Sequence, residues 1–128
     1  MDAKREYKRL RQLGWPARDA WRSAKVAERF AQLEDAGLVR LRTDVDLDPA
    51  TVLDFDGTPR ERQAVAKRAD AVGVWGLVAE ARCPHCESWH VVDSCWGFVG
   101  EDYLDSGYDS DLMRAAIDAV DDGTRRAA

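Results

Sequence analysis

Two runs of strand-forming residues, Val74–Arg82 and Trp89–Val99, lie on either side of a short polar turn. The runs are rich in Val, Trp and Phe, residue types that favour strands, and so short a connection is typical of an antiparallel hairpin. The sequence therefore predicts a sheet that contains this β-hairpin, with cysteine and histidine residues at its tip.

Apolar residues recur at helical spacing in three other segments, and each repeat predicts an amphipathic helix. In the second segment the predicted apolar stripe includes Trp21, and in the third Gly123 is expected to cap the end. The predicted helices are Ala3–Leu13, Ala17–Ala36 and Asp111–Asp122.

Local signals predict one more helix and one more strand. Thr58 followed by Pro59 and Glu61 forms a capping box, which predicts a helix that ends at Val72. Polar and apolar residues alternate over Leu38–Leu47, the pattern of a strand with one buried face.

The predicted order ααβαββα places helices on one three-stranded, mainly antiparallel sheet, which is the architecture of an α+β protein. A length of 128 residues suits a single domain over 1–128. Within it we expect a basic helical lobe over 1–37, an acidic α+β core over 38–123 and a frayed tail over 124–128. No run of 18 apolar residues and no apolar leader is present, and three cysteines are an odd number, so we expect a cytoplasmic protein without a disulfide scaffold.

Charge is divided unevenly along the chain. Residues 1–42 hold 11 basic and 6 acidic residues, whereas residues 43–128 hold 8 basic and 18 acidic residues. A basic N-terminal part can face nucleic acid or an acidic protein, and an acidic C-terminal part can face a basic partner. Alternatively, the two are solvated faces that attract each other within the fold.

The predicted hairpin tip carries the sequence Cys-Pro-His-Cys at residues 83–86. Two cysteines at this separation on a tight turn direct two thiolates to one point, and a neutral imidazole completes many tetrahedral zinc sites. The spacing Cys-x2-Cys-x3-His-x4-Cys resembles the retroviral-type zinc knuckle, with one residue fewer before the histidine. We therefore predict a structural zinc ion, and its expected ligands are Cys83, Cys86, His90 and Cys95.

The fourth ligand has competing candidates. In a regular hairpin Cys95 lies about five residues from the tip, on the order of 16 Å away at ~3.3 Å per residue. His85 and Glu87 in the turn compete with Cys95 for this place. Alternatively, the turn holds no metal and Cys95 packs in the core. A catalytic zinc is not expected, because no separate His-x-Glu accompanies the Cys-x-x-Cys pair: His85 and Glu87 stand two apart, but inside the turn itself.

Two acidic motifs point to other metals. Residues 53–58 resemble the first motif of haloacid-dehalogenase-type phosphatases, which implies Asp54 as nucleophile and Asp56 as acid/base of a magnesium-dependent hydrolase. That family has a doubly wound parallel sheet, which is not predicted here, and Thr58 is better explained as a helix cap. A partial calcium-loop pattern is formed by Asp44, Asp46 and Asp48. Alternating acids on the solvent-facing side of a strand explain this pattern more simply.

Residues 30–42 resemble the end of a recognition helix that enters the wing strand of winged-helix regulators. The resemblance implies a helix-turn-helix upstream, with its second helix in the major groove of DNA. The alternative is an amphipathic helix with a solvated basic face, and acids at 44–48 occupy the place of a basic wing. The residues expected to face DNA are Arg18, Arg22, Lys25 and Arg29.

Residues 74–78 and 93–108 resemble small orphan proteins carried by phages and mobile elements of GC-rich bacteria. The resemblance implies a setting rather than an activity. Accessory proteins of this kind are often small and acidic and bind host machinery, as anti-CRISPR proteins do. No catalytic residue is carried over.

The sequence thus predicts a non-enzymatic accessory protein that inhibits a host nucleoprotein through an acidic C-terminal surface, residues 101–122. A small DNA-binding regulator is the alternative, and a metal-dependent hydrolase is the third interpretation. Trp96 and Phe98 are expected on the core face of the sheet. The predicted partner-binding residues are Glu101, Asp102, Tyr103, Asp105, Tyr108, Asp109, Asp118 and Asp122.

Overall fold

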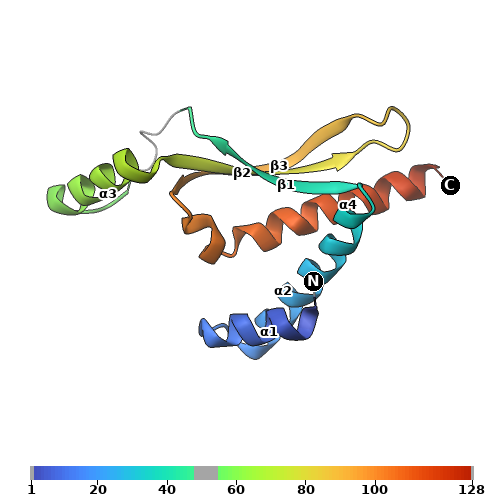
Figure 1. Cartoon of the computed structure of the whole chain (residues 1–128), viewed down its shortest axis with the longest axis horizontal. Coiled ribbons are helices and arrows are strands. Elements are labelled where there is room, and N and C mark those ends of the chain that lie inside the picture. Colours follow the sequence, from blue (N-terminus) through green and yellow to red (C-terminus); the bar gives the residue numbers. More distant parts are fainter. Residues whose placement is uncertain (1, 48–54, 128) are drawn as a thin grey trace.

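The computed structural model describes residues 2–47 and 55–127 and confirms an α+β fold in the order ααβαββα (Figure 1). The helices are α1 (Ala3–Gln12), α2 (Ala17–Asp35), α3 (Pro59–Val72) and α4 (Tyr108–Ala127). The strands are β1 (Val39–Val45), β2 (Val74–Arg82) and β3 (Trp89–Val99). A short 3-10 helix, η2 (Asp102–Asp105), precedes α4.

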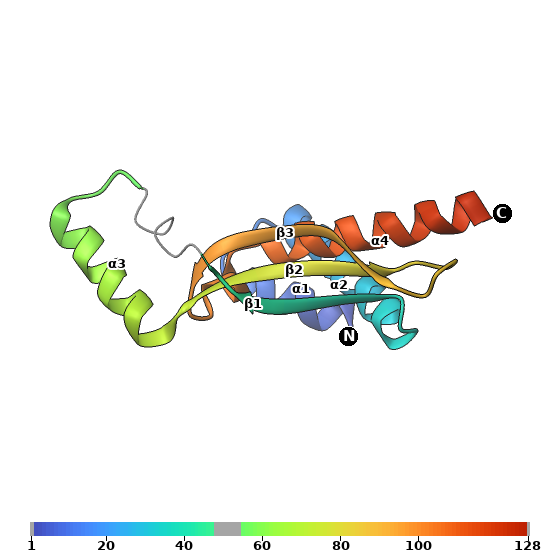
Figure 2. The same ribbon diagram turned by 90° about the horizontal axis from the view of Figure 1, so that it is seen from above.

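The three strands form one antiparallel sheet with β2 in the centre. α2 and α4 lie against one face of this sheet, and Figure 2 looks onto the other face, which no helix of the described chain covers. The core forms where Leu77 and Ala79 of β2 meet Phe30 of α2 and Leu112 of α4. An antiparallel sheet covered on one side only can present polar residues to solvent on the other.

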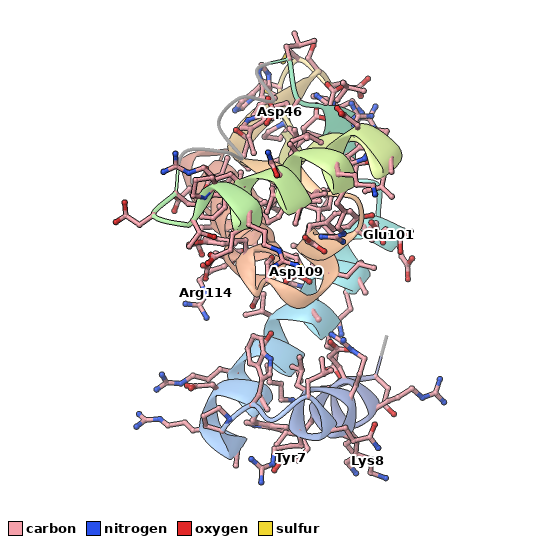
Figure 3. The ribbon with its side chains drawn as sticks, turned by 90° about the vertical axis from the view of Figure 1, so that its left-hand side faces the viewer. Tyr7, Lys8, Asp46, Glu101, Asp109 and Arg114 are labelled. Atoms are coloured by element: carbon pink, nitrogen blue, oxygen red, sulfur yellow. The ribbon has the colours of Figure 1, made fainter. Side chains whose placement is uncertain are left out.

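α1 and α2 form a helical hairpin that extends away from the sheet (Figures 1 and 3). The side chain of Asp2 caps α1 by accepting a hydrogen bond from the backbone N–H of Lys4 at 2.9 Å. The predicted stripe of α2 is wrong at Trp21, since Ala20 is buried instead. Trp21 lies at the surface, where its ring meets that of Tyr7 edge-on at a centroid distance of 5.8 Å.

α4 is longer at both ends than the predicted helix 111–122. Gly123 lies inside it rather than capping its end, because a glycine in a helix costs only about 1 kcal/mol relative to alanine and does not by itself end the helix. A Cβ atom at Gly123 would lie 3.7 Å from the ring of Pro84, so α4 passes close to the tip of the β2–β3 hairpin.

The prediction that Trp96 and Phe98 share the core face holds only for Phe98. The β2–β3 register shifts between Trp75 and Leu77, and Gly97 adopts a positive φ of 90° within this bulge. The extra residue places Trp96 on the uncovered face, where its indole lies over Gly76 and 45% of the residue is exposed. Phe98 is buried.

α3 projects from the end of the sheet and contains no buried residue (Figure 1). Its predicted capping box is present, since the backbone N–H of Glu61 donates to the Thr58 hydroxyl at 3.2 Å. A two-pronged ion pair joins α3 to η2, because Arg68 donates to both carboxylate oxygens of Asp102 at 2.7 Å.

The uncovered face of the sheet contains a buried carboxylate that the sequence analysis missed. Glu80 of β2 has a side chain only 7% exposed, and it accepts hydrogen bonds from Arg40 at 3.2 and 3.3 Å and from Arg42. The guanidinium of Arg40 also lies 4.2 Å from the ring centre of Trp89. Hydrogen bonding to Arg40 and then Arg42 lowers the pKa of Glu80, against the opposing effect of burial.

We expect Glu80→Gln to lower the free energy of unfolding at pH 7 by about 1.5–3 kcal/mol, the usual worth of a hydrogen bond to a charged group. Because the pKa of Glu80 is lowered in the folded state, its pairing stabilises fully above the unfolded value of about 4.3 and is lost as the pH falls through the folded pKa. Urea denaturation across pH 3–7 should therefore show the two proteins converging in acid. Asp44→Asn, which removes an exposed partner of Arg42, is the control and should cost under about 1 kcal/mol. A Glu80→Gln cost that is independent of pH would contradict the assignment.

Candidate metal centre

The turn between β2 and β3 is held by backbone hydrogen bonds that gather its two cysteines. The N–H of Cys83 donates to the carbonyl of Ser88 at 2.8 Å, and the N–H of Glu87 donates to the carbonyl of Cys83 at 3.0 Å. Glu87 completes the turn with a positive φ of 59°. The N–H of Cys86 points back at the Cys83 sulfur, 3.4 Å away. The Cys-x-x-Cys pair is therefore folded onto one side of the turn.

β3 begins with Trp89 and places His90 beside these thiols. One ligand atom from each of Cys83, Cys86 and His90 lies within 4.8 Å of the others, and the Cys86 sulfur is 3.5 Å from His90 Nε2. Two sulfurs and one imidazole nitrogen are donors that zinc prefers. Cys83 is half-buried, whereas Cys86 and His90 are exposed.

Hydrogen bonding favours the thiolate form of Cys86. The contact with His90, followed by the backbone and hydroxyl of Ser88 and by Cys83, lowers the pKa of Cys86 to about 6. A thiolate is the form that binds metal, so this lowered pKa favours cation binding at neutral pH. Ser88 was not recognised in the sequence, although a hydroxyl residue two positions after a Cys-x-x-Cys pair is a usable signal.

The other candidate ligands lie outside this cluster. Cys95, predicted as the fourth ligand, sits opposite Leu77 on β2, where it packs against the hydrophobic core and burial raises its pKa. It is five residues along an extended strand from His90, too far to share one ion. Glu87 in the turn forms an ion pair with Arg82 at 3.7 Å. His85 is exposed and is not part of the group either.

The predicted partner-binding residues are dispersed rather than gathered. Asp102 is neutralised by Arg68, whose hydrogen bonds lower the pKa of the Asp102 carboxyl. Asp109 is half-buried, burial raises its pKa, and it lines a cavity of about 400 Å³ between the helical hairpin and α4. The side chain of Asp105 lies outside the part of the chain that the structure describes.

The remaining members of that set are divided between packing and solvent. Tyr103 and Tyr108 both contact the ring of Phe98, at centroid distances of 6.2 and 6.0 Å, so they serve the core as well as the surface. Figure 3 shows Glu101 and Asp109 in the part of the molecule formed by η2 and the start of α4. The acidic residues of the set that are exposed to solvent are Glu101, Asp102, Asp118 and Asp122.

The basic side chains predicted to face DNA share one face of α2. Arg29 pairs with Asp121 of α4 at 3.7 Å, and Lys25 lies 3.9 Å from Glu28. Arg18 and Arg22 are exposed and form no ion pair with a described residue. β1, which stands in the position of a wing, directs Arg40 and Arg42 to Glu80 on its own sheet.

The other acidic motifs do not assemble into sites. Asp54 and Asp48 lie outside the described residues. Asp56 is exposed ahead of α3, where Thr58 acts as a helix cap, and Asp44 pairs with Arg42 at 3.0 Å. The sheet is antiparallel, whereas the phosphatase motif needs the end of a parallel strand.

Comparison of the chain with protein-family models, curated proteins and solved structures finds no match. Among residues 2–47 and 55–127, no helix has both the length and the apolar character needed to cross a bilayer. The class of protein is therefore described from the fold and the site alone: it is an α+β protein with a Cys2His donor cluster at a hairpin tip.

Proposed function

We propose that this chain is a non-enzymatic zinc-binding accessory protein that acts by contact with a macromolecular partner, in the cytoplasm of a bacterial host. The observation that carries the proposal is the convergence of Cys83, Cys86 and His90 at the β2–β3 tip. Zinc held there would tie the turn to the first residues of β3 and so fix the shape of the tip. A tip of fixed shape supports a role in binding a partner.

The surroundings of the cluster favour a structural rather than a catalytic metal. A hydrolytic zinc needs a general base beside its bound water. Within the described residues the nearest carboxylate in sequence, Glu87, is directed to Arg82 and is 79% exposed at its side chain. The described side chains would not exclude water from an ion at this position, because Cys86 and His90 are exposed.

The proposed partner is a basic site on a host nucleoprotein, which the acidic C-terminal surface would occupy in an anti-CRISPR-like manner. The carboxylates best placed for this role form no ion pair with any described residue: Glu101, Asp111 and Asp118. Tyr108, about half exposed beside them in sequence, adds an aromatic contact.

The test of the metal assignment is elemental analysis of protein purified without chelator. We expect about one zinc per chain, because the cluster supplies one set of three donors. Protein that contains no bound metal, and that takes up none when zinc is added to reduced samples, would contradict the proposal.

A second candidate function, DNA binding through the helical hairpin, is favoured by the exposed cations of its two helices. Arg18 and Arg22 lack ion-pair partners among the described residues, and Lys8 of α1 projects from the same end of the molecule (Figure 3). Against it, β1 does not present a basic wing, and α4 contributes acids beside α2.

We expect no sequence-specific affinity for duplex DNA at physiological salt, because the acidic residues 43–128 repel the phosphate backbone. Any binding at low salt should weaken steeply as salt is added, since each phosphate contact releases counterions. Fluorescence anisotropy at 50 and 200 mM salt measures both the affinity for duplex DNA and its salt dependence. The double variant Arg18→Ala/Arg22→Ala is the control. A specific complex with a Kd below about 10⁻⁸ M at physiological salt would favour the DNA-binding regulator over the accessory protein.

A further inference from the structure

The metal cluster offers three donors where zinc takes four ligands. Cys95 is held in the core opposite Leu77, and Glu87 pairs with Arg82. Among residues 2–47 and 55–127, no fourth histidine, cysteine or carboxylate joins the group. The described chain therefore leaves one coordination position to be filled from outside the cluster.

That position faces solvent at the end of the molecule. Cys86 and His90 are exposed, and only Cys83 is half-buried. Figures 1 and 2 show the β2–β3 turn at the end of the sheet opposite α3, in the open beside the C-terminal end of α4. Pro84 lies close to Gly123, so the turn passes beside this helix. A side chain of another macromolecule can reach such a tip, whereas the described residues form no pocket there that would enclose a small substrate.

Building on the proposed zinc site, we infer that its fourth coordination position is open and binds an external nitrogen or sulfur donor, the histidine or cysteine side chain of a protein partner. Two thiolates cancel the charge of Zn²⁺, so a water in this position is weakly acidified and readily replaced. Imidazole and thiolate match the donors already present and suit zinc as a borderline-soft ion. The hairpin tip thereby becomes an anchoring point for the partner.

Cobalt substitution of the full chain tests this inference, with imidazole as the probe for a histidine side chain and 2-mercaptoethanol for a cysteine. We expect thiolate-to-cobalt absorption from Cys83 and Cys86, and a saturable 1:1 shift of the ligand-field bands on adding either probe. His85→Ala and Cys95→Ser are matched controls that should retain both the starting spectrum and the shift. Sedimentation should show a monomer before and after addition.

Several outcomes would overturn the open position. The first two are ligand-field bands that respond to neither probe and removal of cobalt by the probe. The next two are loss of thiolate absorption in Cys95→Ser and an altered starting spectrum in His85→Ala, since either would add a ligand to the cluster. The last is a dimer that forms only with metal. The proposed function fails in a different way, since a protein without the Cys2His site gives no thiolate-to-cobalt absorption at all. The two failures are therefore distinguishable in one titration.

Discussion

Serine in place of Cys83 or Cys86 is expected to abolish zinc binding and to lower the melting temperature of the zinc-loaded protein by about 10 °C. A ligand that binds only the folded state at 1,000 times its Kd adds about 4 kcal/mol, and each kcal/mol shifts the midpoint of a chain this size by about 3 °C. Differential scanning calorimetry with and without chelator measures the effect. Chelator should bring the parent to the same midpoint as the variants.

Two controls separate the metal from the fold. His85→Ala removes an exposed imidazole outside the cluster and should change neither zinc content nor midpoint. Cys95→Ser places a hydroxyl against the core, so it should lower the midpoint while leaving the zinc content at that of the parent. If His85→Ala loses zinc as Cys86→Ser does, the ligand assignment is wrong.

Reversal of the exposed acids, Glu101→Lys/Asp111→Lys/Asp118→Lys, is expected to weaken binding to the nucleoprotein partner about tenfold. Each exposed charge contributes on the order of 0.5 kcal/mol, and about 1.4 kcal/mol corresponds to tenfold. The salt dependence of the association rate should fall as well, because the surface charges steer the encounter. Affinity capture from a bacterial host identifies the partner, and surface plasmon resonance across salt concentrations measures the effect.

The matched control reverses three exposed acids on other elements, Glu34→Lys/Asp35→Lys/Asp70→Lys, with the same change in net charge. It should retain the affinity of the parent. Asp109 is left unchanged in both variants, because it is half-buried against the helical hairpin and its reversal would disturb the fold. Equal affinities for the two triple variants would show that only total charge matters, and would remove the acidic C-terminal surface from the proposal.

The hairpin and the metal ligands were predictable because their signals are local. β2 and β3 have the bounds that their composition indicates, and a Cys-x-x-Cys turn followed by His90 brings three donors together through a few residues of chain. Distance along the strand already placed Cys95 beyond reach of the tip. Its position opposite Leu77 agrees with that estimate.

The errors arise where tertiary contacts override local pattern. A single bulge at Gly97 moves Trp96 to the uncovered face, and alternation alone gives no sign of it. Gly123 reads as a helix cap in isolation, yet α4 continues past it beside Pro84. Glu80 reads as an ordinary strand glutamate, because its pairing with Arg40 depends on the β1–β2 register.

α3 also bears on how the chain tolerates changes in length. The last residue of β1, Val45, is the register partner of Trp75 near the start of β2, so the two strands already form the arms of an antiparallel hairpin. The segment between them, α3 included, lies within the connection of that hairpin, and α3 buries no residue. The core between β2, α2 and α4 uses none of the residues that the structure describes in this segment. For protein engineering, this connection is the natural point at which to shorten the chain to a two-residue turn or to insert a reporter domain.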